Sequence, residues 1–155
     1  MKRLLIVAFF FALSLSAAST VYTQERKIER KDLPPAVEQT VARESAGATI
    51  KGFTTEKDNG KRVYEVELMV DGRARDIEMD ADGNIREIEQ EVVFDSLPDS
   101  VKTALKARAG TSTISKVESL TKGGKIVAYE ADVTNGSKRR EIQVGPNGEK
   151  LSKEQ

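Results

Sequence analysis

The chain repeats the same order of helix and turn signals at a constant spacing, which limits the folds open to it. The segment LPPAVEQTVARESAG at 33–47 is matched by LPDSVKTALKARAG at 97–110, and the offset stays at 64 or 65 throughout. Further matched pairs are Ile50 and Ile114, Tyr64-Glu65 and Tyr129-Glu130, Ile77 and Ile142, and Asp82-Gly83 and Asn147-Gly148. A constant offset over so many markers predicts a tandem duplication.

Each copy reads as one helix followed by strands. Pro34 and Pro98 stand where a helix begins, because the first helical N–H groups have no partner within the helix. Gly47 and Gly110 fit the left-handed position just beyond a helix end. Turn sequences then separate strand-like runs: Asp58-Asn59-Gly60, Asp71-Gly72 and Asp82-Gly83 in the first copy, and Gly123-Gly124, Asn135-Gly136 and Asn147-Gly148 in the second.

These signals predict an α+β fold of two tandem repeats. Each repeat has one helix followed by a roughly four-stranded antiparallel sheet, and the two are packed as one unit. A unit this short buries its apolar face poorly alone, so we expect a shared core or a continuous sheet. Whether the two sheets are continuous or packed face to face is left open by the sequence.

The first residues have the marks of a signal peptide at 1–18. Lys2 and Arg3 precede an apolar run at 4–15 and small residues at 16–19. That run of 12 residues is well short of the roughly 20 that span a bilayer. The chain has no cysteine to carry a lipid. We therefore expect a periplasmic or secreted protein with no membrane anchor after cleavage of the signal peptide.

The rest of the chain divides into five segments. They are a polar N-terminal segment at 19–32, a first repeat at 33–92, a linker at 93–96, a second repeat at 97–151 and a tail at 152–155.

The order of these motifs resembles a known family. An L-P-x-x-V helix start, a Tyr-Glu strand and a D-G or N-G turn before the last strand look like the PepSY-like domains of secreted bacterial proteins. The tandem arrangement is similar to beta-lactamase-inhibitor-like proteins. The resemblance covers 33–151 and implies an extracytoplasmic binding or inhibitory module.

No catalytic constellation is visible in the sequence. The chain has no histidine and no cysteine, which excludes histidine acid–base catalysis, thiol nucleophiles and the usual zinc ligand sets. A Ser–Lys pair remains open as a hydrolase alternative, although no particular serine is placed beside a particular lysine. We therefore expect a protein that is not an enzyme and needs no cofactor.

Three motifs that invite a functional interpretation are better explained by structure. The run DADGN at 80–84 has its glycine at the fourth position, whereas a calcium loop needs it at the sixth, so we predict a hairpin turn and no metal site. Tyr64 and Tyr129 alternate with apolar residues, which predicts rings buried under a helix. The run Lys138-Arg139-Arg140 cannot share one strand face, and without aromatic residues among these cations we expect no nucleic-acid binding.

Charge is the feature that points to a partner. Residues 33–92 hold 8 basic and 14 acidic residues, a net charge of −6, and residues 97–151 hold 10 basic and 6 acidic residues, a net charge of +4. Strand alternation places five acids of the first repeat on the side away from its helix. These candidate partner-binding residues are Glu65, Glu67, Asp76, Glu78 and Asp80. The alternative is that Lys51, Arg86 or the basic second repeat neutralises them.

We expect a secreted or periplasmic, non-enzymatic protein-binding module. Its partner would be an unidentified extracytoplasmic protein, and it would inhibit or regulate an enzyme such as a peptidase. The alternative is a cell-envelope sensor or structural component that binds cations or peptidoglycan.

Overall fold

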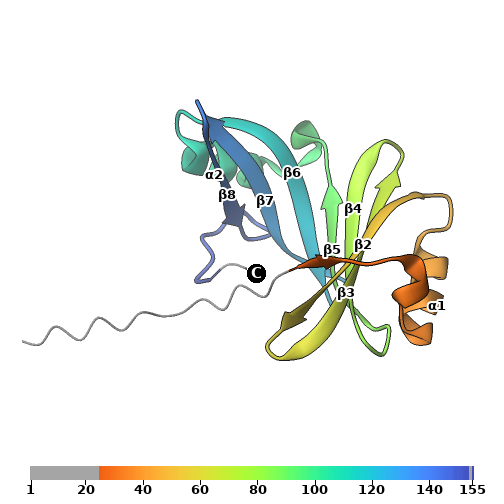
Figure 1. Ribbon diagram of the computed structural model, residues 1–155. Coiled ribbons are helices and arrows are strands. Elements are labelled where there is room, and N and C mark those ends of the chain that lie inside the picture. Colours follow the sequence, from red (N-terminus) through yellow and green to blue (C-terminus); the bar gives the residue numbers. More distant parts are fainter. Residues whose placement is uncertain (1–24, 154) are drawn as a thin grey trace, which may run out of the picture.

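The protein is built on one antiparallel sheet, seen in a computed structural model that describes residues 25–153 and 155. In this part of the chain eight strands follow one another in chain order, each paired with the next (Figure 1). They are β1 (Arg26–Lys27), β2 (Thr49–Asp58), β3 (Lys61–Val70), β4 (Arg73–Asp80), β5 (Ile85–Glu91), β6 (Thr113–Lys122), β7 (Lys125–Asn135) and β8 (Lys138–Val144). The helices are α1 (Pro35–Glu44), α2 (Asp99–Ala109) and the short 3-10 helices η1 (Arg30–Asp32) and η2 (Phe94–Ser96). The predicted α+β class is confirmed.

The turns form where the sequence predicts them. Asn59 and Gly60 join β2 to β3 with φ of +49° and +80°, and Asp71 and Gly72 join β3 to β4 with φ of +50° and +79°. Positive φ at both central residues is the type I′ geometry, whose twist matches that of the flanking strands. The turn sequences are therefore sufficient to set an antiparallel meander.

Both helices cover the same face of the sheet. The α1 helix buries Val37 and Val41, and α2 buries Val101 and Leu105. On the strands beneath them, the paired apolar residues run Val66–Ile77–Ile88 in the first half and Val117–Ala131–Ile142 in the second. The pairing Gln90–Ser119–Tyr129 carries this face from β5 to β7. No helix of the described residues lies on the opposite face of the sheet.

The sheet is continuous, but the apolar residues form two separate cores. In one core, side chains of α1 pack against β3 and β4, and in the other, side chains of α2 pack against β6, β7 and β8. Figure 1 shows why, since α1 and α2 lie at opposite ends of the sheet. Strands β5 and β6 pair only over 88–91 and 118–121. The predicted packing as one unit therefore rests on backbone pairing and not on a shared core.

The second half has three strands after its helix where the sequence predicts about four. After β8 the chain turns back, and the N–H of Gly145 donates to the carbonyl of Glu149 over 2.8 Å. Residues 150–153 then form no strand. In the first half the residues after the matching turn form β5, which pairs with β4 and also with β6. Beyond β8 the described chain offers no further strand with which to pair.

The last turn of each half packs against the start of its helix. Gly83 has φ of +78°, and a Cβ there would lie 2.4 Å from the carbonyl oxygen of Ala36. Gly148 has φ of +85°, and its Cβ would lie 2.5 Å from the carbonyl oxygen of Ser100. Such distances are far inside van der Waals contact, so only glycine fits either position. This contact fixes each helix over its own strands.

The N-terminal segment joins the sheet ahead of the first helix. The segment predicted at 19–32 is described from residue 25, and the predicted signal peptide at 1–18 lies outside the described residues. Here the N–H of Ile28 donates to the carbonyl of Phe53 over 3.0 Å, just after β1 ends. In the second half the N–H of Val92 donates to the carbonyl of Val117 over 2.9 Å, just after β5 ends. The same backbone contact thus recurs 64 residues later.

Candidate binding face

The face of the sheet without helices brings four of the five predicted partner-binding residues into two facing pairs. Register places Glu65 opposite Glu78 and Glu67 opposite Asp76 on β3 and β4. Like charges placed directly opposite one another are mildly destabilising, so folding gains nothing from these pairs. The geometry is the one that strand alternation predicts, while binding of a partner stays a prediction.

Asp80 lies on the same face but serves the turn between β4 and β5. Its Oδ1 accepts the backbone N–H of Asp82 at 2.9 Å and that of Asn84 at 3.0 Å. The side-chain amide of Asn84 also donates to Oδ2 at 3.0 Å. These hydrogen bonds, led by the one from the Asn84 side chain, lower the pKa of Asp80. The hairpin turn predicted for 80–84 is therefore confirmed, and Asp80 shapes it.

The acidic surface extends well beyond the first strand pair. Asp76 is also opposite Glu89, and Glu78 is opposite Glu87. Across the junction, Glu91 is opposite Glu118, and Glu118 is opposite Glu130. We call the following set the acidic face: Glu65, Glu67, Asp76, Glu78, Glu87, Glu89, Glu91, Glu118, Glu130 and Asp132.

Sequence reasoning did not include the β5 and second-half members in the candidate site. One signal was present, since Glu87, Glu89 and Glu91 alternate along the run IREIEQE at 85–91. The contribution of Glu118 and Glu130 depends on β5 pairing with β6, which no local pattern indicates.

Three carboxylates meet where β4, β5 and β6 run side by side. Oxygens of Asp76, Glu89 and Glu118 all lie within 4.8 Å of one another. Glu118 is buried, and its Oε2 accepts from the ammonium of Lys116 at 2.7 Å. Each carboxylate could offer one oxygen ligand to a hard cation. Among the described residues, this is the group of three acids whose oxygens lie close enough to meet on one ion.

Burial and mutual repulsion raise the pKa values of these acids. Burial is the first cause at Glu65, Asp76 and Glu89, where the pKa is raised to about 8, about 6 and about 7. Nearby carboxylates add to each shift, as Asp76 does for Glu65. Burial also raises the pKa of Glu78 and of Glu130. A cation bound here would favour the charged form of these acids.

Some acids are neutralised within the molecule, as the sequence alternative allowed. Arg86 contacts the carboxylates of Asp58 and, at 3.0 Å, Glu78. Lys122 of the second half pairs with Glu87 at 2.9 Å. Among the described residues, no lysine or arginine nitrogen lies within 4.0 Å of the carboxylates of four further acids. These four are Glu65, Glu67, Asp76 and Glu89.

The two tyrosines lie away from this face. Tyr64 is 9% exposed and packs in the first core, and Tyr129 is 8% exposed and packs in the second. The predicted burial of both rings under the helices is confirmed. The acidic face can attract cations or basic side chains, and among the described residues it places no activated nucleophile beside an acid or base.

The fold and this face define an α+β protein with two helices on one side of a meandering sheet and carboxylates on the other. Residues 62–151 match the family described as "Putative beta-lactamase-inhibitor-like, PepSY-like". Because the match spans more than half of the chain, the protein belongs to this PepSY-like family. The resemblance seen in the sequence is confirmed.

Solved structures agree with the fold. A BLIP-like protein from Bacteroides fragilis NCTC 9343 is 22% identical, with 73% of this chain and 79% of that chain covered and a TM-score of 0.54. A protein described as a "putative periplasmic" one from Bacteroides eggerthii DSM 20697 is 16% identical, with 76% and 84% covered and a TM-score of 0.63. At these identities the likeness shows the fold alone. A search among curated proteins finds no match.

Neither helix of the described region could cross a bilayer, since none there is both long and apolar enough.

Proposed function

We propose that the protein is a periplasmic, non-enzymatic binding module that recognises a basic surface of another extracytoplasmic protein through its acidic face. The observation that carries this proposal is the row of carboxylates across β3, β4 and β5, four of which have no lysine or arginine nitrogen within 4.0 Å among the described residues. Facing like charges cost folding stability. A basic partner would offset that cost on binding.

The order of elements supports a duplicated binding platform. We infer that the two halves arose by tandem duplication, because helix, strands and the glycine contact at Gly83 and Gly148 recur at a near-constant offset. We also infer export through the predicted signal peptide, in keeping with the periplasmic description of a similar structure. Inhibition or regulation of a peptidase or another enzyme is the role that the family resemblance implies.

Association across such a face should be steered by charge. Complementary charges raise association rates, and this effect weakens with added salt. The test compares the mature chain with Glu67→Lys and Glu67→Gln, each immobilised and exposed to periplasmic extract at rising salt. We expect a retained basic protein that is lost from Glu67→Lys and reduced on Glu67→Gln.

Glu44→Lys is the matched control, because Glu44 lies at the end of α1 and away from the sheet face. It makes the same charge change and should retain the partner. Equal retention by Glu67→Lys and wild type would assign binding to another surface.

Cation binding is a second candidate, supported by the cluster of Asp76, Glu89 and Glu118. Ca²⁺ takes several oxygen ligands, including carboxylates, at one site. If the cluster holds Ca²⁺, millimolar CaCl₂ should raise the thermal midpoint of the wild type and leave that of Asp76→Asn unchanged. An equal response of both proteins would mean only general screening of the acidic face.

A further inference from the structure

A recess lies on the helix side of the sheet, where the chain leaves β5 and crosses to α2. It has a volume of about 640 Å³ and is lined by the end of β5, by η2, by the end of α2 and by the first half of β6. Its apolar residues are Val92, Phe94, Ala109, Ile114 and Val117. Pockets of this size hold small ligands or a few side chains.

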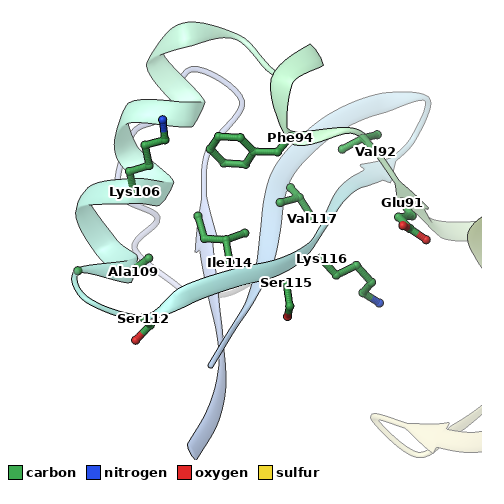
Figure 2. Close-up of a pocket in the computed structure, with 11 residues that line it drawn as sticks. Glu91, Val92, Phe94, Lys106, Ala109, Ser112, Ile114, Ser115, Lys116 and Val117 are labelled. Atoms are coloured by element: carbon green, nitrogen blue, oxygen red, sulfur yellow. The ribbon is translucent and has the colours of Figure 1, made fainter. Parts of the chain in front are cut away.

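A bulge turns two β6 side chains into this recess. The register with β7 shifts between Ile114 and Lys116, so Ser115 is the extra residue. A bulge re-aims the side chains that flank it. Figure 2 shows Ile114 and Val117 pointing from one strand toward Phe94, with Lys116 on the other side of the strand. The recess therefore has an apolar wall formed by strand and η2 together.

The same recess is bordered by an open strand edge. Strand β6 pairs with β7 along its length, but its described pairing with β5 covers only 118–121. One more backbone bond, from Val92 to Val117, closes the end of that pairing. Within the described part of the chain, residues 113–116 thus have a strand neighbour on one side only. An unpaired edge is a template for another strand, and peptides bind proteins in this way.

One cation stands over the apolar wall. The ammonium of Lys106 lies 5.4 Å from the centroid of the Phe94 ring. Among the described residues no carboxylate lies within 4.0 Å of this ammonium, whereas Glu91 accepts the backbone N–H of Ala74 and Lys116 pairs with Glu118. The mouth of the recess therefore carries a positive charge that is free to meet an anion.

The first half of the chain shows that the fold does not require this arrangement. Phe53 holds the place of Val117, since each carbonyl accepts the N–H that follows the preceding strand. Ala42 holds the place of Lys106, eight residues after the proline that precedes each helix. The first half therefore has a larger side chain on the strand and no cation at the helix position that matches Lys106.

We propose that this recess and the open edge of β6 form a docking site for an extended acidic peptide segment of a partner protein. The segment pairs its backbone with 113–116 in line with β5. One large apolar side chain enters the recess against Phe94 and Ile114. A carboxylate two residues away along the segment, on the same face of the added strand, meets Lys106. This site opens on the helix side of the sheet, although Glu91 of the acidic face also lines the recess.

The test uses the ¹⁵N-labelled mature chain and capped peptides of about seven residues with alternating threonines. The lead peptide has phenylalanine at its centre and glutamate two residues away on each side. Its variants replace phenylalanine by alanine, glutamate by lysine, or the residue next to the centre by proline, which removes a strand donor. We expect the lead peptide alone to shift and protect the amides of 113–116.

Three protein variants separate the parts of the site. Val117→Phe introduces the side chain found at Phe53, and it should lower the affinity for the lead peptide at least about tenfold by filling the recess. Lys106→Ala introduces the side chain found at Ala42, and it should lower this affinity about three- to tenfold through loss of the charge. Arg108→Ala removes a cation from an exposed position of the same helix and should leave affinity unchanged. Because Lys106 is exposed, its variant tests the site even if Val117→Phe fails to fold.

Three results would overturn the proposal. One is the absence of any shift at 113–116 with the lead peptide. Another is equal binding of the lysine or alanine peptides. The third is a combined result, in which a simple apolar carboxylate such as decanoate binds in the recess and the lead peptide fails to protect the edge amides. The recess would then be a binding site for a small amphiphile. None of these results bears on partner binding at the acidic face, which Glu67→Lys tests alone.

Discussion

Asp76 and Glu89 face each other directly across β4 and β5, and burial raises the pKa of the first to about 6 and of the second to about 7. When two carboxyl groups face each other in a partly buried site, loss of both protons has a high free-energy cost. The molecule consequently keeps protons on its sheet at a pH where the unfolded chain has released them.

The first prediction is that stability falls as the pH rises. A carboxyl group with a raised pKa in the folded state holds more protons there than in the unfolded state, and stability then decreases with pH. The decrease begins near the ordinary values of 3.8 for Asp76 and 4.5 for Glu65 and Glu89, and ends near the raised values of about 6, about 8 and about 7. Because these carboxyl groups are only partly buried, solvent screening reduces the effect below the sum of the three shifts, and urea unfolding at pH 5 and pH 8 should differ by on the order of 2 kcal/mol.

Glu65→Gln should flatten this pH dependence and stabilise the protein at pH 8, because a neutral amide replaces a partly buried carboxylate. Asp95→Asn is the control, since Asp95 is exposed on η2 and away from the acidic face. A pH profile that rises from pH 5 to pH 8, or one that Glu65→Gln leaves unchanged, would contradict the prediction.

The second prediction concerns the cation nearest to the cluster. Lys116→Met leaves the buried Glu118 carboxylate beside Asp76 and Glu89 without its ammonium partner. Breaking a buried ion pair from one side is destabilising, and partial exposure of Lys116 moderates the effect to about 2 kcal/mol at pH 8. The loss should shrink at pH 5, and the double variant Lys116→Met with Glu118→Gln should recover most of it. No recovery in the double variant would assign the loss to packing of the lysine stem.

The third prediction concerns the glycine under α1. Gly83→Ala combines a positive φ with a Cβ 2.4 Å from the Ala36 carbonyl, so it should cost about 3 kcal/mol or more. Gly47→Ala is the matched control, because Gly47 has the same φ of +78° with nothing within 4 Å. It should cost about 1 kcal/mol. Thermal melts of the two variants measure the difference, and equal losses would show that the helix moves away at no cost.

The fourth prediction assigns Asp80 to the turn. Asp80→Ala removes the acceptor of the Asp82 and Asn84 N–H groups and should cost about 1 kcal/mol. The pKa of Asp80 is lowered in the folded state, so this contribution is present above the ordinary value of 3.8 and is lost as the pH falls below it. Asp82→Ala, in the same turn, should be close to neutral. Denaturant melts at pH 7 and pH 3 check both variants.

Local signals were enough to predict most of the fold. Pro34 and Pro98 mark the helix starts, and dipeptides such as Asp71-Gly72 mark the turns, because each depends on the conformation of one or two residues. The missing fourth strand of the second half could not be predicted in this way. Whether a segment forms a strand depends on a neighbour elsewhere in the chain, and no further strand follows β8 in the described residues.

The candidate site was predicted in part for the same reason. Strand parity was enough to align Glu65 and Glu67 with Asp76 and Glu78. The meeting of Glu89 and Glu118 depends on β5 and β6 being neighbours, which joins residues from different halves. Asp80 shows a second limit of strand parity. Parity predicts the face of the sheet on which a side chain lies, but it does not predict the N–H groups from which that side chain accepts hydrogen bonds.

The junction between β5 and β6 has a mechanical consequence. The two cores stiffen the sheet on either side, and between them the halves are joined by backbone pairing over 88–91 and 118–121 and by a few side-chain contacts such as that of Lys122 with Glu87. The sheet should therefore flex most easily along this line, which would act as a hinge between its two halves. The acidic face runs across the hinge, from Glu89 to Glu130. A rigid partner bound across this line would restrict the bending, so a decrease in the flexibility of the sheet would indicate that the partner has bound.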